Sequence, residues 1–398
     1  MSVVVIGAGQ AGLSVSHGLT DRGVEHAVLE QAQVAQTWRD RWDSFTLVTP
    51  NWTLDLPGSP YAGDDSEGHV ARDEIVAYLT DYADTWSVPV RTGVRVDSVR
   101  PGTPGGFVLE TSEGELDADT VVVCTGGFTA PRRPAGGFPA GLAVLTTYDY
   151  RNAGSVPDGK VLLIGSGQTG VQLADELSRA GRDVFLACGR APWTPKQIEG
   201  LDIITWLHRV GFWDVALADL PVPAGRLTPN AQGTGRAGGQ TLHYRTLQSS
   251  GVTLLGRLAG VEGQKARFVD DLGASVEFGD QRWADMRRLL TDGLPRRGFV
   301  VPELERPDPF TYTAITELDL RGFGAVIFTA GFRPDFGWIE SLPTDAFGFP
   351  VTVDGAVPGR PGLFFCGLHF MRVRRSGTLF GVGPDADLIA TAIARVRV

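Results

Sequence analysis

Two glycine fingerprints constrain the fold of this chain more than any other feature of its sequence. Both have the form Gly-x-Gly-x-x-Gly and directly follow a short apolar run, at 3–6 and at 161–164. The glycines are Gly7, Gly9 and Gly12 in the first fingerprint and Gly165, Gly167 and Gly170 in the second. Each lies between a predicted strand and a predicted helix, where the motif lets a dinucleotide pyrophosphate approach the start of the helix. We therefore predict an α/β fold with two Rossmann-like dinucleotide-binding units.

The residues that follow the second strand of each unit indicate different ligands. In the first unit the strand ends in Glu30, an acid placed to bind the ribose hydroxyls of an unphosphorylated adenosine, as in FAD or NAD. In the second unit the strand at 183–187 runs into Cys188, Gly189 and Arg190, with no acid to repel a 2′-phosphate. Arg190 offers donors suited to that phosphate of NADPH, although an ordinary solvated arginine could also occupy this position.

Composition favours small-molecule partners. The 398 residues suffice for two or three domains, and 42% of them are apolar. The net charge of −10 disfavours a general role in binding nucleic acid or anionic membranes. The N-terminal strand leaves no room for a signal peptide, and no apolar stretch approaches the length of a membrane span. We expect a soluble cytoplasmic protein, with a homodimer as one possible assembly.

The cysteines and histidines give no sign of a metal site or a redox-active dithiol. The three cysteines, Cys124, Cys188 and Cys366, are far apart in sequence and form no Cys-x-x-Cys pair. The six histidines show no ligand-like spacing, and only His369, near a strand end expected to face the flavin, is a candidate for lining a substrate pocket. We predict no bound metal.

The remaining sequence predicts how the units are connected. A Pro- and Trp-rich segment at 31–70 is too long for a plain connector, so we expect it to be functional. A Pro/Gly-rich linker at 132–141 precedes the second unit, and we expect a mobile glycine-rich loop at 233–239. We predict a strand at 274–278 and a helix at 280–291. The apolar run at 325–328 closes on a Thr-Ala-Gly that resembles the Thr-Gly-Gly at 125–127, which suggests a return to the first unit. We therefore assign 1–155 and 325–398 to an FAD domain, and 156–324 to an NADPH domain inserted within it.

With these motifs in place, nearly the whole chain resembles flavin-containing monooxygenase-type (class B) flavoproteins, close to the CzcO-like bacterial branch. The matching stretches are the two fingerprints at 7–12 and 165–170, Thr37-Trp38-Arg39, 41–44, 49–52, 72–74, 331–335, 374–377 and 381–383.

The resemblance and the fingerprints together give a set of expected site residues. The resemblance implies that Asn51 lies beside the flavin ring as the catalytic residue, although Pro-Asn is also ordinary turn chemistry. The tryptophans at 38, 42 and 52 could equally serve packing. We expect the FAD contacts to be Gly7, Gly9, Gln10, Ala11, Gly12, Glu30, Gln31, Thr37, Trp38, Arg39, Gly126, Gly367 and Gly381. We expect the NADPH contacts to be Gly165, Gly167, Gln168, Thr169, Gly170 and Arg190, and we assign Gly331 to a cofactor without choosing between the two.

The chain departs from the family at the signature that joins the two domains. The signature histidine is replaced by Thr146, and its Phe and Gly positions hold Ala140 and Leu142. Tyr150 occupies the final aromatic position, which fits the N- and S-oxygenating branch better than Baeyer-Villiger enzymes. The loss of the histidine puts in doubt the coupling between NADPH binding and the flavin domain.

The resemblance implies an NADPH-dependent FAD monooxygenase that uses O2 to oxygenate a small molecule, at nitrogen or sulfur, through a C4a-hydroperoxyflavin. An NAD(P)H-dependent flavoprotein reductase or oxidase is the alternative that the altered signature favours. A Baeyer-Villiger monooxygenase is a further enzymatic alternative. A non-catalytic nucleotide sensor linked to ion transport is a remote one. The sequence does not indicate the substrate.

Overall fold

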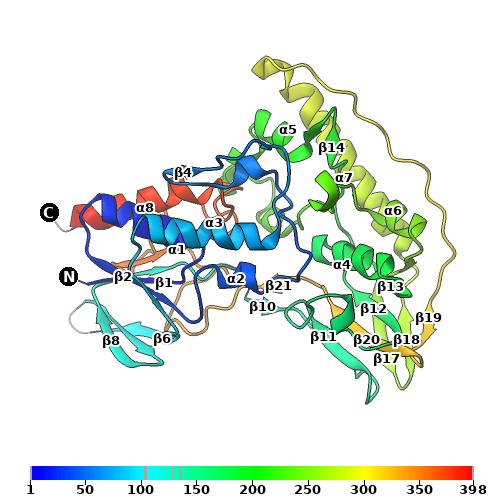
Figure 1. The fold of residues 1–398 in the computed structure, drawn as a ribbon, viewed down its shortest axis with the longest axis horizontal. Helices are drawn as coiled ribbons and strands as arrows, with labels where there is room; N and C mark the ends of the chain where they lie inside the picture. The colour runs from blue at the N-terminus through cyan, green and yellow to red at the C-terminus, as the bar shows by residue number, and fades with distance from the viewer. Residues whose placement is uncertain (1, 103–104, 128, 134–136, 397–398) are drawn as a thin grey trace.

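The protein consists of two α/β units that stand side by side (Figure 1). The computed structural model describes residues 2–102, 105–127, 129–133 and 137–396. Each unit is built on a five-stranded parallel sheet, with the order β22-β9-β1-β2-β5 in the first and β11-β20-β12-β13-β16 in the second. The predicted pair of Rossmann-like units is therefore confirmed.

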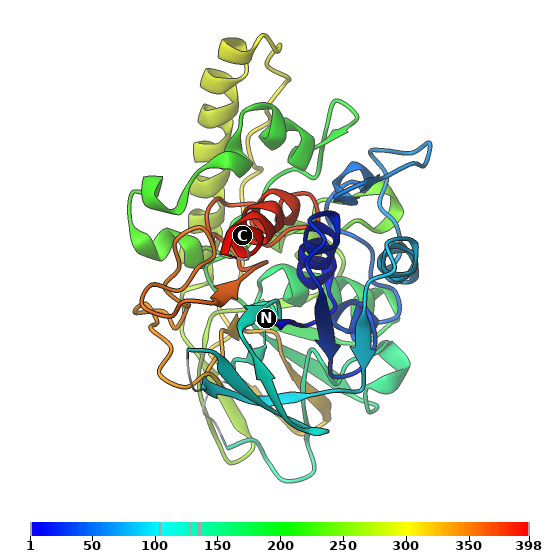
Figure 2. The same cartoon turned by 90° about the vertical axis from the view of Figure 1, so that its left-hand side faces the viewer.

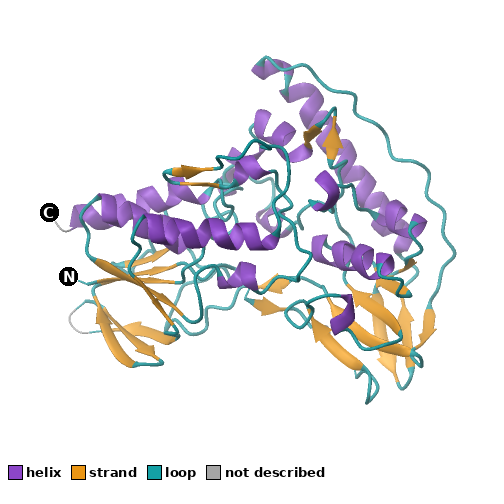
Figure 3. Ribbon diagram, viewed as in Figure 1, coloured by secondary structure: helices purple, strands orange, loops and turns teal. Residues whose placement is uncertain are grey.

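In the first unit, short apolar strands form a sheet that is buried between two layers. All four residues of β1 and of β9 are buried, as expected for parallel strands that are covered on both faces. Three helices lie on one side of the sheet, and an antiparallel sheet lies on the other (Figures 1 and 3). The parallel strands are β1 (Val3–Ile6), β2 (His26–Glu30), β5 (Val90–Thr92), β9 (Thr120–Val123) and β22 (Leu363–Phe365). The helices are α1 (Gln10–Asp21), α3 (Arg72–Thr85) and α8 (Val382–Val396), and the antiparallel strands are β6 (Val96–Pro101), β7 (Phe107–Thr111) and β8 (Gly114–Ala118).

Helices α1 and α8 lie next to each other although they come from opposite ends of the chain (Figure 2). A small residue permits this approach, since a Cβ at Gly18 would lie 3.0 Å from the Cβ of Ala390. The last helix therefore packs on the first unit.

The second unit repeats this plan. Its parallel strands are β11 (Ala143–Thr146), β12 (Lys160–Ile164), β13 (Val184–Ala187), β16 (Thr253–Leu255) and β20 (Phe323–Phe328). Helices α4 (Gln168–Arg179) and α6 (Tyr244–Ser249) pack on one face. A three-stranded antiparallel sheet accompanies it, made of β17 (Leu258–Glu262), β18 (Lys265–Phe268) and β19 (Glu317–Asp319).

Two strands that we assigned to the first domain belong to the sheet of the second unit. Strand β20, which we assigned to the first domain, pairs with β12 and β11 in the second sheet, and β11 lies in that sheet although it precedes residue 156. The resemblance between the sequences at 125–127 and 329–331 has a different cause from the one we inferred. The two triplets follow β9 and β20, which occupy the same position in the two sheets. The domain limits otherwise remain a prediction.

One local prediction was wrong, and another, the mobility of the loop at 233–239, stays a prediction. Residues 274–278 belong to the long helix α7 (Leu272–Gly293), whose buried residues at 272, 275, 276, 279, 283 and 290 follow helical spacing. The alternation of apolar residues at 274–278 was mistaken for a strand. The glycine-rich loop at 233–239 is closely packed against the 31–70 segment, because a Cβ at Gly235 would lie 2.0 Å from the backbone oxygen of Leu47.

Two irregular segments lie between the units. The 31–70 segment holds α2 (Gln36–Arg39), η1 (Asn51–Thr53), β3 (Asp55–Leu56) and β4 (Ser59–Pro60). The segment at 194–239 holds β14 (Gln197–Ile198), β15 (Leu201–Asp202), α5 (Ile203–Arg209), η3 (Phe212–Asp214), η4 (Leu217–Asp219), η5 (Pro223–Leu227) and η6 (Arg236–Gly238). The remaining elements are β10 (Ala130–Pro131), which pairs with β21 (Phe332–Arg333), η2 (Ala153–Ser155) and η7 (Pro295–Arg297).

Residues 134–136 of the predicted linker lie outside the described part of the chain. Within the described part, a membrane could not be crossed by any of the helices, since none combines the necessary length and apolar character.

Candidate cofactor sites and the junction between the units

The first and third glycines of both fingerprints are required by the protein itself. Gly7 and Gly165 have φ values of 102° and 109°, a conformation that side-chain-bearing residues rarely adopt. A Cβ at Gly12 would lie 1.8 Å from the backbone oxygen of Gly7, and one at Gly170 would lie 2.0 Å from that of Gly165. The tight turn and the close helix contact expected from the sequence are thus present in both units.

The middle glycines have no such internal reason. Gly9 and Gly167 have φ values of −86° and −64°, which any residue can adopt. A Cβ built at either position meets nothing within 4 Å. The open space lies beside the backbone at the start of a helix, which is where the motif brings a pyrophosphate. Both fingerprints therefore fit a dinucleotide.

The helices that follow the fingerprints begin without a side-chain cap. Neither α1, which begins with Gln10 and Ala11, nor α4, which begins with Gln168 and Thr169, has a side-chain cap or an acid in its first turn. By contrast, Asp202 caps α5, since its carboxylate accepts a hydrogen bond from the helix backbone. The first-turn N–H groups and the positive end of the dipole are thus available to phosphates at both fingerprints.

Glu30 is held in place at the end of β2. It is buried, and its Oε2 and Oε1 accept hydrogen bonds from the backbone N–H groups of Ala8 (2.9 Å) and Ala32 (3.0 Å). Each carboxylate oxygen can accept a second hydrogen bond. The acid therefore lies beside the first fingerprint with acceptor capacity left for ribose hydroxyls.

The corresponding position of the second unit is built differently. The first glycine of each fingerprint donates to the second strand: Gly7 N to the carbonyl of Leu29, and Gly165 N to that of Ala187. Leu29 and Ala187 are therefore equivalent, and so are the residues that follow them, Glu30 and Cys188. Cys188 is buried and carries no charge, since burial raises the pKa of its thiol. Next to it, the Oγ of Ser166 accepts from Gly189 N (2.9 Å) and lies 2.6 Å from the hydroxyl of Tyr244.

Arg190 follows this network as an exposed side chain. It forms no hydrogen bond or ion pair with another residue in the described ranges. The guanidinium of Arg190 is thus available to a ligand, and the position equivalent to Glu30 carries no acid. This arrangement matches the one expected for binding a 2′-phosphate.

The expected glycines at the other strand ends fall into two groups. Gly126 and Gly331 follow equivalent strands with φ values of 74° and 83°, and neither has a neighbour within 4 Å of a built Cβ. Gly331 belongs with the second sheet. By contrast, a Cβ at Gly367 would lie 2.5 Å from the Cβ of Ala11, and one at Gly381 would lie 2.0 Å from the carbonyl oxygen of Arg375. Internal packing therefore explains the last two.

The short helix α2 brings part of its motif to the first fingerprint. Trp38 Nε1 donates to the side-chain oxygen of Gln10 (3.2 Å). Arg39 instead donates to the carbonyl of Val34 (3.0 Å) and to Thr80 (3.3 Å). The side chains at 31 and 37 are exposed. Of this group, only Trp38 touches a fingerprint residue.

Asn51 is buried, and its amide is hydrogen-bonded within its own segment. Its Oδ1 accepts from the backbone N–H of Val70 (2.7 Å), and its Nδ2 donates to the carbonyl of Asp65 (2.9 Å). The side chain closes the loop between η1 and α3. Its expected role beside the flavin remains a prediction.

The altered signature has a structural role as well. Thr146 is buried at the end of β11, and both its N–H and its Oγ1 donate to Asp149 Oδ2, at 2.7 and 2.8 Å. Tyr150 is completely buried. At the position of the expected histidine, the threonine closes the turn that follows β11, the edge strand of the second sheet.

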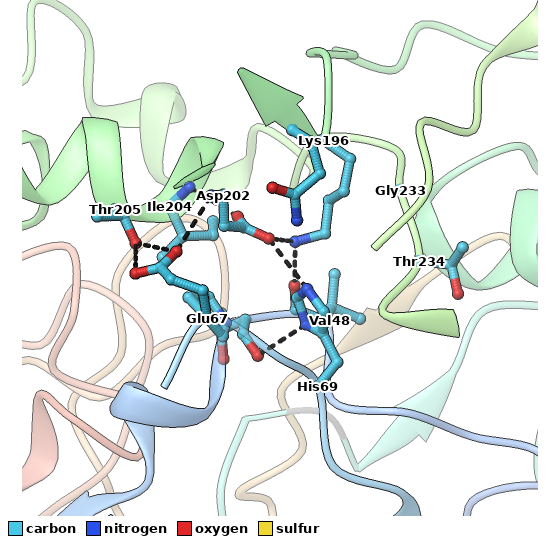
Figure 4. A network of polar contacts seen from close by, with 12 residues as sticks. Val48, Glu67, His69, Lys196, Asp202, Ile204, Thr205, Gly233 and Thr234 are labelled. Atoms are coloured by element: carbon cyan, nitrogen blue, oxygen red, sulfur yellow. Dashed lines mark hydrogen bonds and ion pairs between the residues drawn. The ribbon is translucent and has the colours of Figure 1, made fainter. Parts of the chain in front are cut away.

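A buried cluster of charges joins the two irregular segments (Figure 4). Lys196 forms an ion pair with Asp202, and its Nζ also donates to the carbonyl of Val48 (2.7 Å). The Nε2 of His69 lies 3.2 Å from Asp202 Oδ2, and its Nδ1 lies 3.0 Å from the carbonyl oxygen of Leu47. The side chains of His69 and Asp202 have no exposed surface. Burial lowers the pKa of Lys196, and Asp202 partly opposes this shift.

Glu67 extends the cluster on the same side. Its carboxylate accepts from the backbone N–H of Asp202 (3.1 Å) and from the hydroxyl of Thr205 (2.9 Å). Trp52 Nε1 donates to the same hydroxyl at 2.9 Å. Residues 47–69, which include Asn51, are thus fixed to residues 196–205.

Two of the cysteines, Cys124 and Cys366, are in contact although they are far apart in sequence. The carbonyl of Val123 accepts a hydrogen bond from Cys366 N, so Cys124 and Cys366 are neighbours at the ends of β9 and β22. Both are buried free thiols, and the pKa of Cys366 is raised by its hydrogen bond with Cys124 and by burial. Protonated, buried thiols are unreactive. The described residues contain no group of three or more His, Cys, Asp or Glu side chains arranged for a metal ion.

Sequence reasoning missed the buried cluster. Asp202 precedes an apolar helical run, which is a helix-cap signal, but nothing in the sequence pairs it with Lys196 or His69. Such contacts between distant segments carry no local pattern.

Comparison with known proteins places the chain among flavoenzymes. The model of the pyridine nucleotide-disulphide oxidoreductase family matches residues 4–207, about half of the chain. A protein from Bacillus velezensis named as an uncharacterized oxidoreductase, CzcO, is 31% identical over 97% of both chains. Indole-3-pyruvate monooxygenase YUCCA1 from rice is 33% identical over 52% of this chain and 57% of its own length. A flavin-containing monooxygenase from Stenotrophomonas maltophilia shares the fold, with a TM-score of 0.67 and 21% identity over 100% of this chain and 99% of its own.

Proposed function

Since the chain belongs to the pyridine nucleotide-disulphide oxidoreductase family and is an oxidoreductase, we propose that it is an NADPH-dependent FAD monooxygenase. It would insert one oxygen atom of O2 into a small molecule, with nitrogen or sulfur as the favoured acceptor. The observation that carries the proposal is the pair of unequal fingerprints, one beside Glu30 and the other beside Arg190. The similarity to a plant monooxygenase over half of the chain supports oxygen insertion.

The two units would divide the binding work. FAD would lie with its pyrophosphate at Gly9 and the start of α1, and with its ribose on Glu30. NADPH would lie at Gly167 and the start of α4, with its 2′-phosphate on Arg190. When bound, the flavin accepts hydride from NADPH and activates O2, which is chemistry that no side chain supplies.

The protein's own task is to position the two ligands and to exclude water from the reacting atoms. Three aromatic side chains at the junction suit this task. The ring of Trp52 lies 5.3 Å from that of Phe380 and 5.0 Å from that of His208. They join the 31–70 segment to the start of α8 and to α5, so they form an apolar contact between the units.

Asn51 is our proposed hydrogen-bond donor near the flavin ring. One N–H of its amide donates to the carbonyl of Asp65 (2.9 Å), and the other makes only a long contact with the hydroxyl of Tyr61 (3.4 Å). The proposed role therefore requires this second N–H to exchange the hydroxyl of Tyr61 for the flavin, while the bonds to Asp65 and Val70 hold the side chain in place.

The test is NADPH oxidation by the FAD-loaded protein with a panel of amines, sulfides and ketones, with product masses measured. We expect a mass gain of one oxygen for an amine or a sulfide. A ketone converted to an ester would identify Baeyer-Villiger activity instead. Gly167→Ser tests the NADPH site without disturbing the fold, because serine is a good N-cap and its Cβ meets nothing within 4 Å. This variant should keep its FAD and its melting temperature, and lose NADPH-dependent turnover.

An NAD(P)H-dependent reductase or oxidase is the second candidate, and Thr146 is the observation that favours it. A threonine engaged in closing a turn cannot supply the contact expected from a histidine between the domains. In the same assay, NADPH consumption matched by hydrogen peroxide, with no oxygenated product for any substrate, would support this candidate and contradict oxygen insertion. A protein that holds FAD but consumes no NADPH would support the nucleotide sensor.

A further inference from the structure

Arg374 lies where the last part of the first unit meets the irregular segment of the second. Its backbone N–H donates to the carbonyl of Val215 (3.0 Å), and its neighbour Val373 forms a bridge with Ala216. Three residues further on, the carbonyl of Gly377 faces the side chain of Gln10 at 3.5 Å, at the first fingerprint. Arg374 is therefore at the junction between the proposed FAD site and the second unit.

Arg374 differs from its neighbouring arginines because it has no partner of opposite charge. Arg375 pairs with Asp214 (2.9 Å), and Arg372 lies 3.5 Å from Asp385. The guanidinium of Arg374 has no ion pair or hydrogen bond to any residue that the structure describes, and its Nε is buried without a partner.

The surroundings of this guanidinium are aromatic. Its Cζ lies 4.0 Å from the ring centre of Phe212 and 4.6 Å from that of Phe370. Burial lowers the pKa of Arg374 to about 10, which leaves the side chain charged at neutral pH. Stacking on aromatic faces offsets part of the desolvation, but it uses none of the guanidinium donors.

No acidic side chain of the described structure neutralises this charge, and the nearest titratable groups add none. Burial lowers the pKa of His369 to about 4, with Arg374 and Arg226 contributing, so this histidine is neutral at pH 7. Arg226 is already paired with Asp345 (2.9 Å). A half-buried cation without a counterion is costly for the free protein, and such groups cluster at binding sites.

We propose that Arg374 binds the carboxylate of an organic-acid substrate whose apolar body contacts the aromatic residues around it. The planar guanidinium presents two parallel donors that match a carboxylate. A phosphate of NADPH offers similar oxygens, but the second fingerprint and Arg190 already provide for it. The inference names the substrate class of the proposed monooxygenase and rests on that function.

Binding to the FAD-loaded protein without NADPH tests the inference independently of oxygenation. Phenylacetate, indole-3-acetate and octanoate are each compared with their neutral amides, by calorimetry and by changes in the flavin absorbance. We expect at least one acid to bind more tightly than its amide. Arg374→Gln should weaken that acid by about 10- to 100-fold, the usual effect of losing a charged hydrogen-bonding partner. Arg374→Lys, which keeps the charge but not the fork, should fall between the two.

Arg375→Gln is the matched control, since it removes a neighbouring arginine that is paired with Asp214. It should bind the acids as the unaltered protein does, and all variants should bind NADP+ equally. Equal binding of acids and amides to the unaltered protein would overturn the inference, as would unchanged acid binding in Arg374→Gln. Weaker NADP+ binding with unchanged acid binding would assign Arg374 to the cofactor phosphates.

FAD content and melting temperature establish that each variant is folded. If Arg374→Gln fails to fold, Arg374→Lys alone decides by whether it weakens the acid. A carboxylate site without any oxygenated product would contradict the proposed function and leave this inference standing.

Discussion

The two units of this protein share a scaffold and differ at the residue that follows the second strand. Their parallel sheets share the order of four strands, β9-β1-β2-β5 and β20-β12-β13-β16, and differ in the edge strand, which is β22 in the first and β11 in the second. The first and third glycines of each fingerprint make the same close contacts. At the strand end, however, the first unit holds the carboxylate of Glu30 with two backbone N–H groups, whereas the second buries an uncharged thiol at Cys188. In the proposed function, the scaffold would provide the pyrophosphate site twice, and the strand end would decide which ribose binds.

The two sites also differ in whether the side chain at the strand end is already held in place before a ligand binds. Glu30 is buried and fixed, so a ribose bound there would meet acceptors that are already in place. Arg190 is exposed and has no partner in the described chain, so it must lose side-chain freedom when it binds a phosphate. We infer that the first site suits a cofactor that stays bound, and the second suits one that is exchanged.

The largest expected effect tests whether the two scaffolds are equivalent. Gly12→Ala and Gly170→Ala place a Cβ about 2 Å from a backbone oxygen in their own unit, as the built positions at 1.8 and 2.0 Å indicate. Because the turn must move, we expect each to lose about 3 kcal/mol or more of unfolding free energy, at the upper end of overpacking effects. Urea unfolding measures the loss. Gly9→Ser is the control and should stay within about 0.5 kcal/mol. A difference between the two alanine variants of several kcal/mol would show that the units are not equivalent.

An effect of similar size tests whether the units are held together at one buried cluster. Lys196→Met removes the cation that pairs with Asp202, whose side chain has no exposed surface. An uncompensated buried charge typically costs about 3–5 kcal/mol, so the free energy of unfolding should fall by that amount. Adding Asp202→Asn, which can still cap α5, should restore most of the loss.

Lys265→Met is the matched control for that prediction, because Lys265 pairs with Glu317 at the surface, where both side chains are about half exposed. It should cost less than about 1 kcal/mol. If Lys196→Met were as mild as Lys265→Met in urea unfolding, the cluster would not hold the units together.

A smaller effect distinguishes the two cofactors directly. Arg190→Gln should raise the KM for NADPH by about 10- to 100-fold, since a charged hydrogen-bonding partner contributes about 1.5–3 kcal/mol. It should leave the KM for NADH and the FAD content unchanged. Glu30→Gln should do the reverse, with weaker FAD retention and no change in the preference for NADPH. Steady-state kinetics with both nucleotides, and the FAD content after gel filtration, check the pair. An equal loss of NADH and NADPH in Arg190→Gln would contradict a 2′-phosphate contact.

The sequence predicted the parts of the fold that depend on local pattern. Buried parallel strands, such as β1 and β12, read as continuous apolar runs, and each fingerprint marks the turn that follows. The sheet to which a strand belongs is not a local property. Strand β20 was assigned to the first unit because its closing triplet resembles the one after β9, when the resemblance reflects equivalent positions in two sheets.

The candidate sites divide in the same way. Glu30 could be predicted because its distance from the fingerprint is fixed by one strand-helix-strand unit. The contacts of His69 with Asp202 and of Arg374 with Phe212 join segments that are distant in sequence. The hydrogen bonds of Asn51 to Asp65 and Val70 could not be predicted either, because a Pro-Asn pair does not indicate which backbone groups the amide will contact.

The smallest effect tests whether acid loosens the second unit first. His243 caps α6 by accepting a hydrogen bond from Thr246 N (3.2 Å), which requires an unprotonated Nδ1. Burial, with Arg245 contributing, lowers the pKa of His243 from 6.5 to about 4, while the carboxylates of Asp280 and Asp308 oppose the shift. The ring of Trp193 packs against it at 4.5 Å. In the first unit, α3 receives its cap from Glu74, not from a histidine.

The sign of this effect follows from proton binding. Between pH 6.5 and 4 the unfolded chain binds a proton at His243 that the folded chain does not, so stability is present above this window and falls as the pH decreases through it. Solvent screening of this partly exposed side chain limits the loss to about 1–2 kcal/mol. His243→Asn keeps a capping side chain without a titrating group, so this variant should lose less stability than the unaltered protein between pH 7 and 4. His369 titrates with the same sign and is present in both proteins, so the difference between them isolates His243. Urea unfolding across this range measures that difference, and hydrogen exchange at the amides of α6 places it in the structure. Identical pH profiles would mean that the cap at α6 does not make the second unit more acid-sensitive than the first.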